Sequence, residues 1–195
     1  MARLSIKIAA VPMLAVIVAA LCICAHQRAF AAAKITVTSA SFKEDQMMPE
    51  RHAYDKDNLS PSLEWSGIPA GAATIAVICD DPDAPSGNWV HWVIFNIPAS
   101  ASRLQEGMPI AEQFDDGIAQ GTNDFMKPGY DGPYPPFGTH RYVFTVYALD
   151  TVLDLAPGAT RQALMRAMAG HVLGTGSLTG RYKRKIDSPK QDVIE

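Results

Sequence analysis

Two stretches of the sequence decide the fold: Trp89-Val90-His91-Trp92-Val93-Ile94-Phe95-Asn96-Ile97 and Arg141-Tyr142-Val143-Phe144-Thr145-Val146-Tyr147-Ala148-Leu149. Both are rich in β-branched and aromatic residues, and both are largely apolar at odd and even positions alike. This pattern is typical of central β-strands whose two faces are both covered. We therefore expect a layered β-sandwich rather than one open sheet.

The rest of the chain supports a mainly β protein with one or two peripheral helices. Short runs that alternate or are rich in Val, Ile, Thr and aromatics occupy residues 34–40, 62–65, 73–80 and 177–183, and Gly, Pro, Asn and Asp separate them. One helix is predicted over residues 160–173. Thr160 can cap it, apolar residues recur at four-residue spacing, and Gly174 is placed to end it.

The N-terminal residues read as a secretory signal peptide. Arg3 and Lys7 precede an apolar stretch over residues 8–24, and Ala29-Phe30-Ala31 supplies small residues at the spacing of a cleavage site. An uncleaved membrane anchor is the alternative, since the apolar stretch is close to the length that spans a bilayer. We expect residues 1–31 to be removed, residues 32–195 to form a single domain, and the protein to be periplasmic or secreted.

The excess of acidic over basic residues limits the classes of partner that the protein can bind. The chain has 17 Lys and Arg against 20 Asp and Glu, and the three basic residues of the predicted signal would be lost with it. A net negative surface disfavours nucleic acid and anionic membranes. We expect no nucleic-acid partner, and no transmembrane segment after cleavage.

A rigid acidic turn follows the run over residues 73–80. Pro82 and Pro85 fix the backbone of Asp81-Pro82-Asp83-Ala84-Pro85, so Asp81 or Asp83 could hold an imidazole through a hydrogen bond. Alternatively, both aspartates only close the turn. His91 follows, on the same alternation as Trp89, Val93 and Phe95, which places it on an otherwise apolar face, where a histidine is more often a core residue than a ligand.

A second Gly- and Pro-rich loop leads into the other central run. In Gly132-Pro133-Tyr134-Pro135-Pro136-Phe137-Gly138-Thr139-His140-Arg141-Tyr142, glycines allow close approach of a ligand, and aromatic residues can form walls. His140 stands immediately before the strand. The segment over residues 112–139 is too long for a plain connection, so we expect it to build one wall of a site.

At four ordered places the sequence resembles the phosphatidylethanolamine-binding proteins, also called Raf kinase inhibitor proteins, and in particular their bacterial secreted members. The matches are Asn58-Leu59-Ser60-Pro61-Ser62-Leu63-Glu64-Trp65, the Asp81–Pro85 turn with His91-Trp92, the Gly132–His140 loop with Arg141-Tyr142, and Met168-Ala169-Gly170-His171-Val172-Leu173-Gly174. The resemblance implies a Greek-key β-sandwich with a shallow pocket for phosphate, acetate-like anions or phospholipid headgroups.

Matching the motifs residue by residue gives the expected ligand-binding set: Asp81, Asp83, Pro85, His91, Gly132, Pro133, His140 and Tyr142. Pro135 and Pro136 are an alternative match for the family's proline pair in place of Pro133. The C-terminal residues Asp192-Val193-Ile194-Glu195 do not resemble the pocket-closing helix of the animal proteins, so lipid selectivity does not carry over.

Three classes of function follow. The first is a secreted or periplasmic protein that binds a small anion without turnover. The second is a protein-interaction module of the protease- or kinase-inhibitor kind, acting on a secreted or host partner. The third is a weak hydrolase, but Gly176-Ser177-Leu178-Thr179-Gly180 has the wrong glycine spacing for a nucleophile elbow. No pair of histidines has metal-ligand spacing, so no catalytic residue, metal or cofactor is expected.

Overall fold

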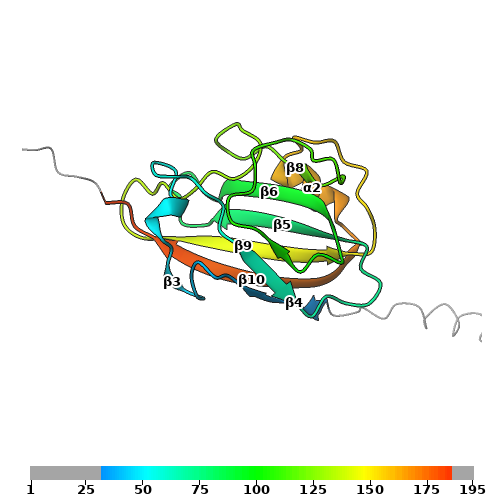
Figure 1. Cartoon of the computed structure of the whole chain (residues 1–195). Coiled ribbons are helices and arrows are strands. Elements are labelled where there is room, and N and C mark those ends of the chain that lie inside the picture. Colours follow the sequence, from blue (N-terminus) through cyan, green and yellow to red (C-terminus); the bar gives the residue numbers. More distant parts are fainter. Residues whose placement is uncertain (1–31, 186–195) are drawn as a thin grey trace, which may run out of the picture. The chain divides into compact units, whose positions relative to one another are not determined.

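Four long strands run side by side at the centre of the fold (Figure 1): β5 (Thr74–Asp81), β6 (Trp89–Pro98), β9 (His140–Leu149) and β10 (Val172–Tyr182). They are antiparallel neighbours in the order β10-β9-β5-β6. Short strands complete this seven-stranded sheet: β1 (Ala33–Lys34), β3 (Gln46–Met47) and β8 (Ala119–Gln120). The computed structural model describes residues 32–185, and the predicted signal peptide lies outside them.

A smaller sheet lies against one face of the larger one. It contains β2 (Thr36–Thr38), β4 (Leu63–Ser66) and β7 (Arg103–Leu104), paired in the order β2-β4-β7. Its inward residues Val37, Leu63 and Trp65 join one core with Val77 and Phe144 of the large sheet. This is the predicted sandwich, and it confirms the mainly β fold class.

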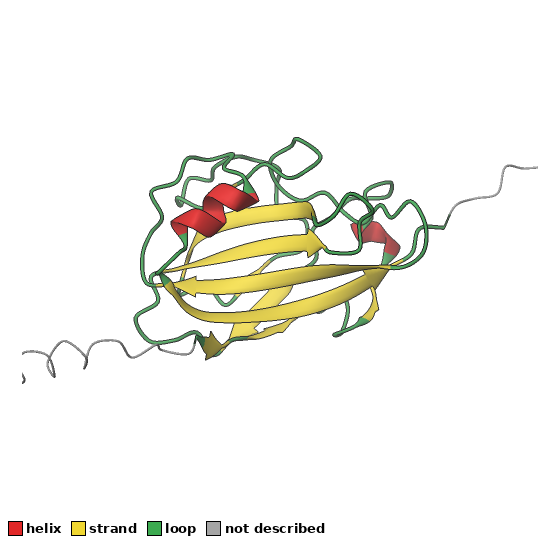
Figure 2. Cartoon of the chain, turned by 180° about the vertical axis from the view of Figure 1, so that it is seen from behind, coloured by secondary structure: helices red, strands yellow, loops and turns green. Residues whose placement is uncertain are grey.

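The other face of the large sheet is covered by helix α2 (Arg161–Ala167) and its flanking loops, as Figure 2 shows. Ala76 and Ile78 of β5 pack there in a second core with Leu164 and Met168. Both faces of the central strands are thus covered, which explains why these strands are largely apolar at odd and even positions alike. A 3-10 turn, η1 (Glu50–His52), is the one other helical element among residues 32–185.

The strand order differs from the chain order because a long connection crosses the fold. β5 and β6 form a hairpin, but β9 pairs with β5 rather than with β6. The chain therefore travels through residues 99–139 before it returns beside the first strand of the hairpin. Such a return distinguishes Greek-key connections from a simple meander, and it brings the ends of β5 and β9 together.

The helix is shorter than the sequence predicts. Thr160 caps it as expected, its Oγ1 accepting from the backbone N of Ala163 at 3.3 Å. The helix nevertheless ends at Ala167, and Gly170, at φ 86°, reverses the chain. Val172 then begins β10 opposite Leu149. The apolar residues expected to extend the helix belong to the turn and to the strand.

Candidate functional site

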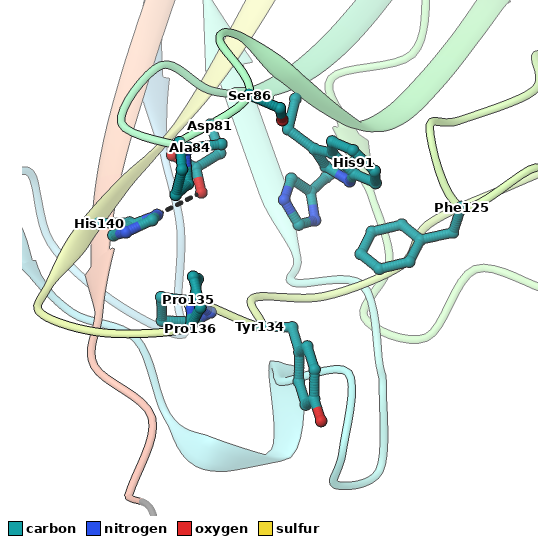
Figure 3. Close-up of a pocket in the computed structure, with 11 residues that line it drawn as sticks. Asp81, Ala84, Ser86, His91, Phe125, Tyr134, Pro135, Pro136 and His140 are labelled. Carbon is teal, nitrogen blue, oxygen red and sulfur yellow. Dashed lines mark hydrogen bonds and ion pairs between the residues drawn. The ribbon is translucent and has the colours of Figure 1, made fainter.

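A cavity of about 270 Å³ opens where β5 ends and where β6 and β9 begin. Figure 3 shows its polar side, formed by Asp81, His91 and His140, and the residues that face them across the opening. The complete lining is Asp81, Ala84, Pro85, Ser86, Trp89, His91, Phe125, Tyr134, Pro135, Pro136 and His140. Four of the eight predicted site residues, Asp81, Pro85, His91 and His140, therefore lie around one space.

A β-bulge turns His91 into this cavity. Cys79 pairs with Trp92 while Asp80 pairs with Val90, so His91 is an extra residue in the ladder. Val90 stays in the core beneath α2, but His91 lies against Tyr142, which belongs to the core on the other face. The prediction that His91 lies on the same face of the sheet as Val93 and Phe95 is wrong, because the bulge turns the side chains that precede it to the opposite face.

The His91 ring is held by its surroundings on two sides. Its Nδ1 lies 2.6 Å from the backbone oxygen of Asp131 and donates to it, and Tyr142 contacts the ring edge-on at 5.1 Å. His91 is only 2% exposed, and burial lowers its pKa. The neutral ring with its proton on Nδ1 is therefore favoured, and Nε2 carries a lone pair.

Asp81 and His140 form a buried pair. His140 Nδ1 and Asp81 Oδ2 are 2.8 Å apart, and both residues are less than 5% exposed. The other carboxylate oxygen, Oδ1, accepts from the backbone N of Asp83 at 2.8 Å, which closes the turn locally. Asp81 thus fulfils both roles that the sequence left open: it shapes the turn and it holds an imidazole.

Asp83 does not line the cavity. Its Oδ1 and Oδ2 accept from Nη2 and Nε of Arg141 at 2.6 and 2.9 Å, and Oδ2 also accepts from the backbone N of Arg141. These hydrogen bonds lower the pKa of Asp83 to about 2. Asp83 therefore ties the acidic turn to the start of β9 and fixes the spacing between Asp81 and His140.

Gly132 and Pro133 also lie outside the lining, in the layer beneath it. The backbone N of Gly132 donates to Asn58 Oδ1 at 2.8 Å, and a Cβ on Gly132 would lie 1.8 Å from the backbone oxygen of His52. Pro133 accepts from the backbone N of Tyr54. Pro135 and Pro136 line the cavity instead, so the alternative proline match fits the geometry better.

Tyr142 is the last predicted site residue outside the lining. It is 1% exposed, and its hydroxyl has no hydrogen-bond partner among residues 32–185. Burial, with the Asp81 carboxylate nearby, raises its pKa well above the ordinary value for tyrosine. Tyr142 therefore supports His91 from behind as a neutral ring.

The aromatic wall contains one residue of the Gly- and Pro-rich loop, Tyr134, where the sequence suggests aromatic walls, and two residues that sequence reasoning missed, Trp89 and Phe125. Phe125 stands edge-on to both Trp89 and His91, at 5.5 and 5.4 Å between ring centroids. The length of the segment over residues 112–139 correctly indicated a wall, but nothing local marked Phe125. Trp89 shares its alternation with His91, and that signal could have found it.

Within residues 32–185, no three His, Cys, Asp or Glu side chains are grouped to hold a metal ion. In the same range, no serine, threonine or cysteine side chain hydrogen-bonds to the ring of His91 or His140.

The helices of residues 32–185 include none with the length and apolar character of a membrane span.

Comparison with known proteins identifies the family. Residues 38–183 match the family model described as phosphatidylethanolamine-binding protein. The chain belongs to the phosphatidylethanolamine-binding protein family. Its relatives include a UPF0098 protein of Methanothermobacter thermautotrophicus, 52% identical over 144 residues, which span 74% of this chain and 95% of the relative. The Escherichia coli UPF0098 protein YbhB is 40% identical over 153 residues, 74% of this chain and 97% of YbhB.

Solved structures of phosphatidylethanolamine-binding proteins share the fold. Escherichia coli YbcL, described as a member of the mammalian family, aligns with a TM-score of 0.72 at 32% identity, over 78% of this chain and all of YbcL (100%). The Chlamydia trachomatis homologue CT736 aligns with a TM-score of 0.71 at 34% identity, over 78% of this chain and 99% of CT736. The expected family and fold are confirmed.

Proposed function

We propose that this protein binds a small anion, phosphate or a phospholipid headgroup, in the cavity between Asp81, His91 and His140, without converting it chemically. One observation carries the proposal: three strands deliver two imidazoles and a carboxylate to one cavity of about 270 Å³, with little exposure of any of the three side chains. Buried polar groups grouped in a concave, mostly apolar site are typical of ligand recognition.

The family name supports the same ligand class, since it refers to phosphatidylethanolamine, whose headgroup contains a phosphoryl group. The arrangement also argues against nucleophilic turnover. Two of the cavity-lining residues, Ser86 and Tyr134, carry a hydroxyl group. Neither His91 nor His140 forms a hydrogen bond with Ser86 that would activate it as a nucleophile. Binding without catalysis is the simpler use of these groups.

Calorimetric titration with inorganic phosphate tests the proposal. We expect saturable binding that His140→Ala weakens about tenfold or more, because the variant removes a polar contact and leaves Asp81 buried without its partner. His171→Ala is the matched control, since His171 also pairs with an aspartate, Asp150, but is exposed and does not line the cavity. Equal affinity of the His140 variant and the wild type would refute the site.

Binding should also depend on pH. An anion is attracted to an imidazolium, but burial lowers the pKa of His91, so its ring gains a proton only in acid and is neutral near pH 7. Because this loss of charge lies below the ordinary histidine value of about 6.5, we expect phosphate affinity to fall as pH rises from about 5 to 7, and His91→Gln to flatten this dependence. An affinity that rises over this interval would contradict a role for the imidazoles.

A surface beside the cavity favours a second function, namely that of a protein-interaction module that docks on a partner protein. Met47, Phe137, Gly138, Lys183, Arg184 and Lys185 line a groove that shares Pro135 with the cavity. Phe137 is 67% exposed, and Arg184 lies over the Tyr134 ring. Exposed apolar side chains beside cations fit a protein partner. A pull-down from extracellular fractions with and without saturating phosphate separates docking on this groove from binding in the cavity.

We further propose that the protein is a secreted member of the family that works in the periplasm or outside the cell. The signal-peptide pattern over residues 1–31 supports this. Fractionation of expressing cells, followed by N-terminal sequencing, should give a mature chain that begins at Ala32. Full-length protein that stays in the cytoplasmic fraction would contradict the proposal.

A further inference from the structure

The groove beside the cavity lies where the described part of the chain ends. Its volume is about 700 Å³, and Lys185, the last described residue, is part of its lining. The ten residues that follow in the sequence therefore start at the groove. We propose that this C-terminal tail, residues 186–195, turns back and occupies the groove as a cover supplied by the chain itself. The inference does not depend on anion binding in the cavity.

The first observation is that apolar side chains are exposed together at this groove. Residues 32–185 contain seven exposed large apolar side chains, and three of them, Met47, Tyr134 and Phe137, lie in the groove or at its edge. Phe137 is 67% exposed and Met47 is 53% exposed. Single exposed apolar side chains are common, but a group of them marks a contact surface. The groove therefore fits an occupant that has apolar side chains of its own.

The second observation is an excess of positive charge along the same groove. Lys183, Arg184 and Lys185 are consecutive, and Lys185 pairs with Glu50. Within residues 32–185, neither Lys183 nor Arg184 forms an ion pair. The Arg184 guanidinium lies over the Tyr134 ring, 4.2 Å from its centroid, so its charge stands beside the apolar part of the groove. An acidic occupant complements these cations.

The tail has both properties. It reads Ile186-Asp187-Ser188-Pro189-Lys190-Gln191-Asp192-Val193-Ile194-Glu195, with three acidic residues against one lysine. Near its end, Asp192 and Glu195 flank the apolar pair Val193-Ile194. This gives an apolar centre between negative charges, which complements exposed apolar side chains beside cations. The match to the family model ends at residue 183, so the tail lies outside the region by which the family is recognised.

The tail is also long enough to return to the groove. Ser188-Pro189 is typical of the first two positions of a β-turn, which reverses the chain soon after it leaves the groove. Val193 lies eight positions after Lys185, a stretch that spans at most about 28 Å when fully extended. A segment on so short a tether has an effective concentration in the millimolar range at its own groove. Even a weak contact is then largely formed within the molecule.

A docked tail would control access to this face of the molecule. Pro135 belongs both to the groove and to the cavity lining, and Tyr134 lines the cavity while it carries Arg184 on its ring. Figure 3 shows both residues on the side of the cavity that faces Asp81 and His140. A partner protein that docks on the groove must first displace the tail. The tail is therefore a built-in competitor for the groove.

Photo-crosslinking in the full chain tests the contact. p-Benzoylphenylalanine in place of Ile194 reacts on irradiation with C–H bonds close to it, and mass spectrometry of peptides locates the product. We expect the main product to be intramolecular and to join the tail to Met47 or to residues 135–138. The same group in place of Val152, which is 65% exposed beyond the opposite end of β9, is the control and should not label the groove.

Charge reversal tests the proposed complementarity. Lys183→Glu with Arg184→Glu should lower the yield of the intramolecular product at least about fivefold, and about 0.5 M salt should act in the same direction, because exposed charge pairs are screened. Arg103→Glu, at an exposed arginine on β7, is the matched control and should leave the yield unchanged. Asp192→Lys with Glu195→Lys should also lower the yield, and the two reversals together should restore it.

A competition measurement completes the test. A fluorescent peptide with the sequence of residues 186–195 should bind Asp192→Lys/Glu195→Lys about tenfold more tightly than the wild type, whose groove is already occupied. This variant changes no described residue, so it decides the matter if the Lys183/Arg184 variant does not fold. Equal affinity of the peptide for the variant and the wild type would overturn the proposal.

The crosslinked products identify any other occupant. A main product with twice the mass of the chain would place a second copy in the groove, and a product with a foreign protein would place a partner there. Either result, or labelling confined to residues away from the groove, would overturn the intramolecular cover. Phosphate binding is tested separately, by the calorimetric titration of His140→Ala, so the failure of one proposal leaves the other standing.

Discussion

Asp81 and His140 are 59 residues apart in the chain, and their Oδ2 and Nδ1 atoms lie 2.8 Å apart in the fold. The contact exists because β9 returns to pair with β5 after the long crossover, with Asp80 opposite Val143. The pair therefore depends on the topology of the whole sheet. It also sets the chemistry of the cavity, since it buries a carboxylate where an anion is proposed to bind.

The ion pair between Asp83 and Arg141 should control the stability of the protein in acid. Arg141 lowers the pKa of Asp83 in the folded protein to about 2, below the value of about 3.9 for an unfolded chain. The stabilisation is therefore present above about pH 4 and is lost as pH falls toward 2. We expect Asp83→Asn to lower the free energy of unfolding by about 1 kcal/mol at pH 6, because the pair is partly exposed and screened.

Urea denaturation at pH 6, 4 and 2 measures this difference. The wild type and Asp83→Asn should converge in stability at pH 2. Asp45→Asn is the matched control at a more exposed pair, with Arg181, and should have a smaller effect. A gap between wild type and Asp83→Asn that stays constant down to pH 2 would contradict the assigned role.

The hydrogen-bond network of the Asp131 side chain should contribute strongly to stability. Asp131→Ala removes the acceptor of the part-buried Asn58 Nδ2 and one of the two acceptors of the buried Asn123 Nδ2, which keeps its hydrogen bond to the Gly129 oxygen. We expect a loss of about 1–3 kcal/mol, which is the range for leaving a buried donor unsatisfied. Chemical denaturation measures it, with the exposed Asp115→Ala as control. A loss below 1 kcal/mol would show that the network is not what holds the loop.

The same variant should disturb His91. The Nδ1 proton of His91 is accepted by the backbone oxygen of residue 131, whose position depends on the hydrogen bonds of the Asp131 side chain. In Asp131→Ala the His91 ring should therefore populate both tautomers. Nitrogen-15 chemical shifts of the imidazole report the tautomer directly, and an unchanged Nδ1–H signature in a folded variant would argue against positioning by Asp131.

Gly132 should tolerate no side chain. The Cβ of Gly132→Ala would overlap the backbone oxygen of His52 at 1.8 Å, so the loop under the cavity must move. We expect a loss of about 2 kcal/mol or more. Gly71→Ala is the comparison, since it has a positive φ but open space and should show only the milder backbone penalty. Thermal unfolding of the two variants side by side separates steric overlap from backbone strain.

The sequence predicted the parts of this fold that depend on local pattern. The central strands were expected at residues 73–80, 89–97 and 141–149, and they occupy Thr74–Asp81, Trp89–Pro98 and His140–Leu149. Burial on both faces was evident for residues 89–97 and 141–149, because these two runs are largely apolar at odd and even positions alike. The two-residue strands, such as β7 and β8, were not predicted, since pairs of residues are too short to show a period.

The candidate site was harder to predict because it depends on tertiary contacts. The two histidines and Asp81 came from turns and strand ends that stood out in the sequence, and resemblance to the family united them. The orientation of His91 could not be inferred, because a bulge appears only when β5 and β6 pair. The support of the ring by Asp131, Asn58 and Asn123 joins three separate loops, and no local spacing indicated it.

Nuclear magnetic resonance of the histidine rings during a phosphate titration tests the central claim most directly. The described part of the chain contains four histidines, and they provide internal controls: His91 and His140 line the cavity, whereas His52 and His171 do not. The account predicts saturable shifts of the His91 and His140 ring signals with one common dissociation constant, and little change at His52 and His171. Saturable binding that shifts His171 or His52 while His91 and His140 stay unchanged would contradict it.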